Sequence, residues 1–204
     1  MNAPRSALNV LAGAALLVGT PALCVPAPVS APVSAASAAA PALPPSRDER
    51  VAQALLAAQE AAGSADPAAL GDALRVIDRS GARPMEGWTG ADPVPAWRAL
   101  VPEAAGSPLR GSPLGPGYRS GQIGAGKSDS FQQVFLSGRK ASIALSAVGG
   151  EPLSLRVVDA DHKPVCLADA QRRACRWVPV FTQRYLIEVR NGGQSQANYF
   201  LVVD

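Results

Sequence analysis

Residues 129–164 read DSFQQVFLSGRKASIALSAVGGEPLSLRVVDADHKP, and apolar residues recur at every second position in three successive runs. This period of two is typical of β-strands that bury one face. The inward-facing residues of the runs are Phe131 and Phe135, then Ile143 and Leu145, then Leu153, Leu155 and Val157. Ser142 and Ser146 point outward. Turn residues (SGRK, VGGEP, ADHKP) separate the runs, so this stretch predicts neighbouring strands in a β-rich domain.

The same pattern continues to residue 204. YRSGQI precedes the first run, and VCLA, ACRWVPV, RYLIEVRN and ANYFLVVD follow the third. We therefore expect seven or eight short strands between residues 118 and 204. The predicted fold class is mainly β, with a β-sandwich as its architecture.

Residues 118–204 resemble the bacterial pre-peptidase C-terminal domain, a jelly-roll-like β-sandwich that accompanies secreted enzymes. The resemblance rests on DSFQQVFLSGRKASIAL, on LSLRVVDADHKPV and on the closing RYLIEVRNGGQSQANYFLVV. Two features depart from the family pattern: His162 and Lys163 stand where Asp-Gly is common, and a cysteine pair at 166 and 175 is not general. These motifs are packing positions, so the resemblance implies the fold and says little about function. No catalytic domain fits before residue 118.

A small α-helical hairpin is expected at residues 46–81. Ser46 followed by Glu49 forms a capping box, Asp66 and Pro67 mark the start of a second helix, and Gly81 suits its C-terminal end. The apolar stripe of the hairpin is rich in alanine, so we expect it to need support from another part of the chain.

Residues 82–117 form a predicted connector rich in proline and glycine, with one short helical turn near residues 95–101. Trp88 and Trp97 are expected to anchor it on the folded part, because each buries a large apolar area. The alternative is an exposed aromatic platform for a ligand.

The N-terminus resembles a secretory signal. Arg5 is the only charged residue before Arg47, and residues 7–19 form an apolar run too short for a membrane span. We predict a signal peptide at residues 1–35, cut between Ala27 and Ala40, and a disordered linker rich in proline and alanine at 36–45. An uncleaved anchor and lipidation at Cys24 are the alternatives.

Removal of Cys24 leaves Cys166 and Cys175, and two cysteines in an oxidising compartment predict a disulfide. A zinc site would need four ligands, and only these cysteines and His162 are obvious candidates. A catalytic dithiol usually has two residues between its cysteines, and this pair has eight.

The predicted disulfide closes a loop of about ten residues, which contributes roughly 2.5–3 kcal/mol by loop entropy. The loop would hold Arg172, Arg173 and Arg176 as candidate ligand-binding residues for carboxylates or phosphates. The alternative is a solvated hairpin tip. Trp177 is expected to be a core residue at the start of its strand.

Three further chemistries have partial motifs in the sequence. A hydrolase site at His162 lacks a G-x-S-x-G motif. Calcium binding by Asp159 and Asp161 lacks the remaining oxygen ligands, and such carboxylates often bond their own turn. GQIGAGKS at 121–128 matches a P-loop pattern, but strand-like segments flank it. We expect no catalytic residue, metal or cofactor.

Charge divides the chain unevenly. Residues 47–106 hold six basic and nine acidic residues, whereas residues 107–204 hold twelve basic and seven acidic residues. An acidic helical part beside a basic sandwich favours docking between them, or an anionic envelope polymer as partner. We therefore expect a periplasmic or secreted, non-catalytic binding or structural module. Its partner would be such a polymer or another exported protein, and not nucleic acid. The alternatives are a hydrolase that uses His162 and a lipoprotein anchored through Cys24.

Overall fold

The computed structural model describes residues 44–104, 115–169 and 174–204. Within them the helical elements are α1 (Arg47–Gly63), α2 (Pro67–Ser80), α3 (Val94–Leu100), η1 (Pro102–Ala104) and η2 (Val148–Gly150). The strands are β1 (Arg83–Pro84), β2 (Gly117–Ile123), β3 (Ser128–Phe135), β4 (Ala141–Ala147), β5 (Leu153–Val158), β6 (Pro164–Ala168), β7 (Ala174–Trp177), β8 (Gln183–Asn191) and β9 (Ala197–Val203). The predicted signal peptide, Cys24 and most of the predicted linker lie outside the described residues.

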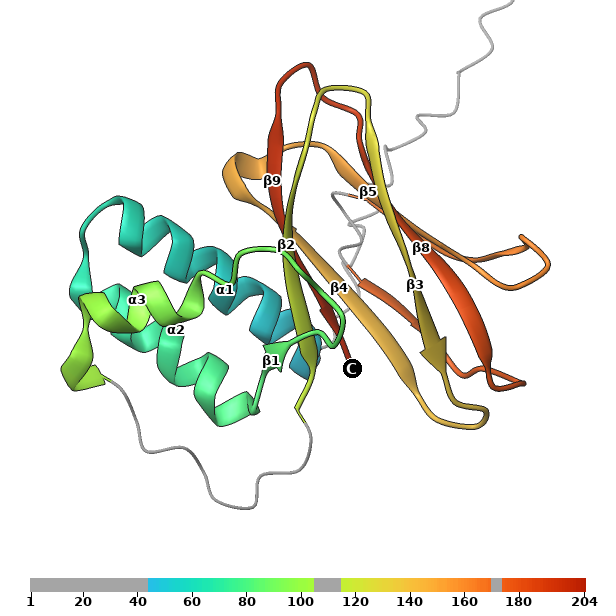
Figure 1. The fold of residues 1–204 in the computed structure, drawn as a ribbon, viewed down its shortest axis with the longest axis horizontal. Coiled ribbons are helices and arrows are strands. Elements are labelled where there is room, and N and C mark those ends of the chain that lie inside the picture. The colour runs from blue at the N-terminus through green and yellow to red at the C-terminus, as the bar shows by residue number, and fades with distance from the viewer. Residues whose placement is uncertain (1–43, 105–114, 170–173) are drawn as a thin grey trace, which may run out of the picture. The chain divides into compact units, whose positions relative to one another are not determined.

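The strands form two sheets that pack face to face, as the sequence predicted. One sheet has the order β1-β2-β9-β4-β7, and the other has the order β3-β8-β5-β6. Every pairing is antiparallel except the two-residue contact of β1 with β2. Eight of the strands, β2 to β9, fall in the region for which seven or eight were expected. The fold is a β-sandwich preceded by helices (Figure 1).

The core between the sheets contains the residues that the alternating pattern pointed inward. Its fully buried members include Ile143, Leu155, Val157, Ile187, Val189 and Leu201. Phe135, Trp177 and Tyr185 close one end of this core, with ring centroids 4.8–5.6 Å apart. Period-two alternation therefore identified the buried face of the strands correctly.

The helical hairpin forms as the capping residues predicted. Glu49 accepts a hydrogen bond from the Ser46 backbone N–H at 2.7 Å, and Asp66 caps α2 by accepting from the N–H groups of Ala68 and Ala69. Gly81 ends α2 in the left-handed region, at φ 64°. The apolar stripe of this hairpin consists largely of alanine, and it is stable because it packs against the sheet that contains β2, β9 and β4.

A second core joins the helices to the outer face of the first sheet. Tyr118, Ala144, Phe200 and Val202 of the sheet are buried in one cluster with apolar residues of α1, α2 and α3. Figure 1 shows the three helices gathered beside β2, β9 and β4, with β3, β8 and β5 on the far side of the sandwich. The helical part therefore covers one sheet and leaves the outer face of the other uncovered by described residues.

The serines expected to point outward from β4 face α1 rather than water. Ser146 is buried and its hydroxyl donates to the Ala52 carbonyl oxygen at 2.9 Å. Ser142 donates to the Asp48 carboxylate at 2.6 Å. These two hydrogen bonds fix the position of α1 over the sheet, and they give a buried role to polar residues that the sequence alone assigned to solvent.

The connector is anchored by its tryptophans, as predicted. Trp97 in α3 is 5% exposed and meets Phe200 edge to face, with ring centroids 6.0 Å apart. Trp88 is partly buried against the same cluster. The short helix lies where a helical turn was expected, so the exposed-platform alternative does not describe Trp97.

The cysteine pair forms the expected disulfide, but the strands around it do not form a hairpin. Cys166 lies on β6 and Cys175 on β7, and these strands belong to different sheets. The Cα atoms of the two cysteines are 5.8 Å apart. A hairpin of β6 and β7, which the alternative of a solvated hairpin tip assumed, is therefore not formed, because alternation within a strand does not say which sheet the strand joins. The disulfide cross-links the two sheets at one edge of the sandwich.

Candidate functional site

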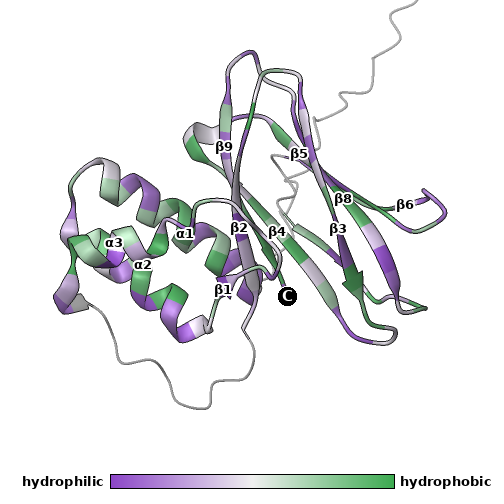
Figure 2. Cartoon of the chain, viewed as in Figure 1, coloured by the Kyte–Doolittle hydropathy of each residue, from purple (hydrophilic) through white to green (hydrophobic). Residues whose placement is uncertain are grey.

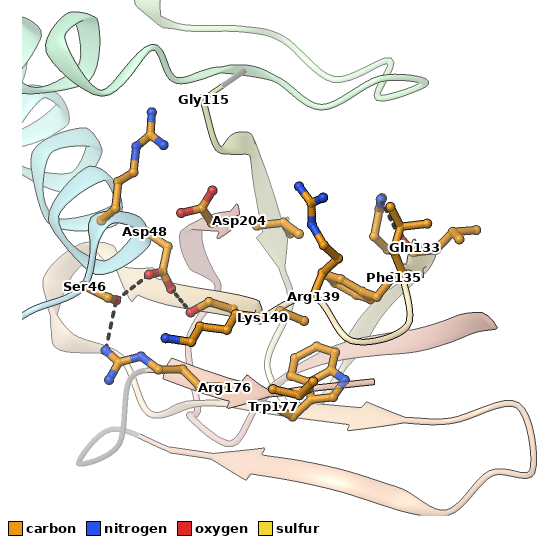
Figure 3. A pocket seen from close by; sticks show the side chains of 17 residues that line it. Ser46, Asp48, Gly115, Gln133, Phe135, Arg139, Lys140, Arg176, Trp177 and Asp204 are labelled. Carbon is orange, nitrogen blue, oxygen red and sulfur yellow. Dashed lines mark hydrogen bonds between the residues drawn. The ribbon is translucent and has the colours of Figure 1, made fainter. Parts of the chain in front are cut away.

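A groove of about 1030 Å³ lies at the end of the sandwich where β3 and β7 finish. We call it the end groove. It is lined by the start of α1, the end of β3, the β3–β4 turn, the start of β4, the end of β7 and the last residues of the chain from Val203. Figure 3 shows these side chains converging from segments far apart in the sequence. The groove is therefore a product of the tertiary fold.

Four exposed apolar residues lie at the same end: Leu136, Val178, Val180 and Phe181, which we call the apolar tip. Val180 is 75% exposed and Phe181 is 71% exposed. Leu136 and Val178 also line the end groove. In Figure 2 the arrowhead of β3, beside the tip, has the colour of apolar residues. Exposed apolar side chains that cluster in this way mark interaction surfaces in exported and cytosolic proteins alike.

The two loops that carry the apolar tip brace each other. The Gly138 N–H donates to the Pro179 carbonyl oxygen at 2.9 Å. The Ser137 hydroxyl donates to the Val180 carbonyl oxygen at 2.6 Å, and the Ser137 N–H donates to the Thr182 hydroxyl at 3.0 Å. The tip is consequently held in place by the sandwich before any partner arrives.

The groove wall beside the tip carries cationic side chains. Arg139 and Lys140 follow the β3–β4 turn, and neither makes an ion pair with a described residue. On the opposite wall Asp48 is 1% exposed, and the hydroxyls of Ser46 and Ser142 both donate to its carboxylate. The carboxylate of Asp48 is therefore engaged with its neighbours, while the two cations remain available.

Arg176 is the one predicted binding residue that the structure describes, and it lies on β7 rather than on the connecting loop. Its guanidinium pairs with the Glu49 carboxylate and donates to the Ser46 hydroxyl at 2.9 Å. Arg172 and Arg173 lie outside the described residues. Arg176 thus ties the sandwich to the start of α1 at the edge of the end groove.

The same contacts shift the titration of Glu49. Partial burial raises its pKa, but a hydrogen bond from the Ser46 N–H, a hydrogen bond from the Ser46 hydroxyl, whose one proton Glu49 shares with Asp48, and the Arg176 charge outweigh burial and hold the pKa below the usual value. Glu49 is therefore ionised in neutral solution and keeps Arg176 in place.

His162 and its neighbours form a turn. His162 has φ 61° between β5 and β6 and is exposed. The Asp159 carboxylate accepts from the backbone N–H groups of Asp161 and Lys163, at 3.0 and 2.8 Å. The hollow of about 110 Å³ beside His162 is otherwise lined by Arg156, Val158, Leu186 and Glu188. Among the described residues around it there is no serine, threonine or cysteine to serve as a nucleophile.

The remaining motifs resolve into local structure. The P-loop-like segment forms the connection between β2 and β3, and a strand begins at Ser128 where a P-loop requires a helix. In the part of the chain that the structure describes, no group of three or more His, Cys, Asp and Glu side chains is placed to hold a metal ion. Nor does any described helix have the length and apolar character of a membrane span.

Sequence reasoning missed the apolar tip. Leu136, Val180 and Phe181 lie in or beside turn segments, and a strand pattern says nothing about the exposure of turn residues. One signal was present in the sequence: "WVPVF" places four apolar residues around a proline, where a polar turn is usual. A run of this kind at a predicted turn is a candidate interaction surface.

Comparison with known proteins finds similarity only at the level of solved structures. No family model matches the chain, and no curated protein matches its sequence. The pre-peptidase C-terminal domain of a collagenase from Bacillus anthracis is 14% identical, with a TM-score of 0.39, over 43% of this chain and 87% of that chain. The β-sandwich that the sequence-based resemblance implied is present in this chain as two sheets.

Two other solved structures are similar to a comparable extent. A periplasmic inhibitor of g-type lysozyme from Aeromonas hydrophila is 12% identical, with a TM-score of 0.38, over 44% of this chain and 84% of that chain. The Yersinia pseudotuberculosis-derived mitogen is 11% identical, with a TM-score of 0.39, over 43% of this chain and 83% of that chain. At this level of identity the similarity concerns the sandwich fold alone.

Proposed function

We propose that this chain is an exported, non-catalytic binding module of the bacterial envelope, and that it binds its partner with the apolar tip and the end groove. The observation that carries the proposal is the placement of Leu136, Val178, Val180 and Phe181 beside two cations, Arg139 and Lys140, that make no ion pair with any described residue. Apolar contact supplies the binding free energy, and the cations select an anionic partner.

Export is supported by two independent features. The apolar run at residues 7–19, followed by small residues, is typical of a signal peptide. The Cys166–Cys175 disulfide favours an oxidising compartment. Both features support periplasmic or secreted localisation.

A non-catalytic role is supported by the surroundings of the chain's only histidine. A hydrolytic nucleophile needs a base within hydrogen-bond reach and a group that orients the base. His162 lies in an exposed turn, with no described nucleophile around its hollow. The competing hydrolase hypothesis is tested by comparing wild type with His162→Ala on a broad panel of ester, peptide and glycoside substrates. Turnover that is lost in the variant would contradict the proposal.

The binding surface is tested with the mature protein and isolated bacterial envelopes, by co-sedimentation. The double variant Val180→Ser/Phe181→Ser should lower the bound fraction strongly. The matched control is Leu167→Ser, because Leu167 is an exposed leucine on β6, at 62%, outside the end groove. Equal binding by wild type and both variants would show that the tip is not the binding surface.

The lipoprotein alternative depends on Cys24 and needs a separate measurement. Mass spectrometry of the mature N-terminus distinguishes cleavage between Ala27 and Ala40 from an acylated Cys24. An acylated cysteine would make the protein membrane-anchored regardless of what the tip binds.

A further inference from the structure

We propose that the apolar tip inserts into the surface of an anionic lipid membrane. This inference rests on the proposed function and names the partner of the same surface. Its occupant is a bilayer rich in anionic headgroups, such as phosphatidylglycerol, facing the compartment into which the protein is exported.

The shape of the tip favours a deformable partner. Val180 and Phe181 are the most exposed of the large apolar side chains described, and neither lines the end groove. They extend from the end of the sandwich instead of lining a hollow. A protein partner would need a matching cavity for both side chains, whereas the boundary between headgroups and acyl chains accepts them without one.

The rigidity of the tip lowers the cost of insertion. Three hydrogen bonds at 2.6–3.0 Å join the β3–β4 turn to the β7–β8 connection. Leu136 from the first loop and Phe181 from the second therefore enter the interface together. Because the loops are already ordered, little conformational entropy is lost on binding.

The charges around the tip match an anionic surface. Residues 130–150 and 174–187 contain no aspartate or glutamate, and they contain four arginines and lysines. Arg139 and Lys140 follow the first loop, and exposed Arg184 lies opposite Val134 on the β3–β8 ladder, three residues after Phe181. Cations at this position remain at the headgroup level while the apolar side chains enter the membrane.

The acidic groups of this end belong to the α1 side of the end groove. Asp48 is buried and hydrogen-bonded to Ser46 and Ser142, and Glu49 is paired with Arg176. Asp204 follows β9 and lines the same groove as Arg139 and Lys140. Two of these three side-chain carboxylates, Asp48 and Glu49, are already bound to neighbouring residues, which limits their repulsion of anionic lipid.

Vesicle sedimentation with the mature chain tests the proposal. Wild type should bind vesicles that contain phosphatidylglycerol at least about tenfold more strongly than vesicles of phosphatidylcholine alone, with binding that weakens as salt is added. Val180→Ser/Phe181→Ser should reduce binding to the anionic vesicles by about tenfold or more. Phe181→Leu should retain most of the binding, because it keeps an apolar side chain.

Two further variants separate charge from apolar insertion. Arg139→Gln/Lys140→Gln should weaken binding to anionic vesicles several-fold and reduce its salt dependence, with no effect on neutral vesicles. Leu167→Ser should behave as wild type. Thermal unfolding of each variant checks that the sandwich is intact, and these exposed positions make loss of folding unexpected.

Failure of this inference is distinguishable from failure of the proposed function. If wild type ignores anionic vesicles, but envelope binding still depends on Val180 and Phe181, the lipid assignment is wrong. The partner is then an acidic protein or an anionic polymer, and the binding surface stands. Vesicle binding that is equal in wild type and the tip variant also overturns the inference.

Discussion

Gly121 on β2 lies directly opposite Tyr199 on β9, and the tyrosine ring occupies the space that a side chain at Gly121 would need. The Tyr199 hydroxyl reaches across to the Asp129 carboxylate on β3, which also binds Arg119 of β2 at 3.1 Å. Arg119 in turn stacks over the Phe131 ring at 4.2 Å. This network links the two sheets at the edge opposite the disulfide.

Gly121→Ala should destabilise the sandwich. A Cβ at this position would come within 2.4 Å of the Tyr199 ring, so either the ring or the strand must move. We expect a loss of roughly 1–3 kcal/mol in the free energy of unfolding, measured by urea denaturation. Gly63→Ala is the control, because the added methyl group meets nothing within 4 Å. Equal stability of the two variants would contradict the proposed role of the ring.

Removing the disulfide should weaken the sandwich without changing its fold. The paired change Cys166→Ala/Cys175→Ala is expected to cost roughly 2.5–3 kcal/mol of unfolding free energy, because the unfolded chain regains loop freedom. The oxidised, denatured wild type should show no reactive thiol after signal removal. Two labelled thiols per mature chain would show that the bond does not form in the exported protein.

Alkaline pH should destabilise the protein through two tyrosines. Burial raises the pKa of Tyr199 above its usual value of 10, and the hydrogen bond to Asp129 raises it further. Burial and a hydrogen bond to Asp92 do the same for Tyr118. The folded state then holds these protons more tightly than the unfolded state, so the unfolding free energy falls as pH rises above about 10. Below about pH 10 the titration of these two tyrosines should not affect the unfolding free energy.

The control for the alkaline effect is Tyr118→Phe/Tyr199→Phe. This variant loses two hydrogen bonds and should be less stable at neutral pH, but its stability should fall less steeply between about pH 10 and 12. Chemical denaturation at each pH measures both quantities. An identical slope for wild type and variant would exclude these tyrosines as the cause.

Glu49→Gln should lower the unfolding free energy at neutral pH and weaken its dependence on pH in acid. The pKa of Glu49 lies below its usual value, so its contribution is present above the unfolded pKa of about 4.5 and is lost as pH falls through the folded pKa. We expect a loss of roughly 0.5–1 kcal/mol at pH 7, with wild type and variant converging in acid. Glu60→Gln, at an exposed position of the same helix, should change little.

Because the protein has two cores, its separated parts should differ in their ability to fold alone. A fragment from residue 107 to 204 retains the whole core between the sheets, so we expect a cooperative thermal transition. Its melting temperature should be lower than that of the intact protein, because Tyr118, Phe200 and Val202 lose their cover. Residues 46–106 should not fold alone. A non-cooperative transition of the larger fragment would mean that both cores are required together.

Local patterns predicted the elements of this protein well, and tertiary relationships less well. Capping at Ser46, Asp66 and Gly81 is encoded within a few residues, and the strand faces follow from a period of two. The transfer of the chain from one sheet to the other between Cys166 and Cys175 leaves no local mark, because each strand alternates in the same way in either sheet. The end groove could not be predicted either, because its lining residues come from segments far apart in the sequence.

The disulfide has a consequence for the order in which the exported chain assembles. A secreted polypeptide emerges N-terminus first, so Cys166 and Cys175 both reach the oxidising compartment before β8 and β9 do. Those two strands occupy interior positions, β8 between β3 and β5 and β9 between β2 and β4. Oxidation during translocation would therefore fix the crossover between the sheets while both interior strands are still inside the cell. β8 and β9 would then each insert between their neighbouring strands after the disulfide has already joined the two sheets.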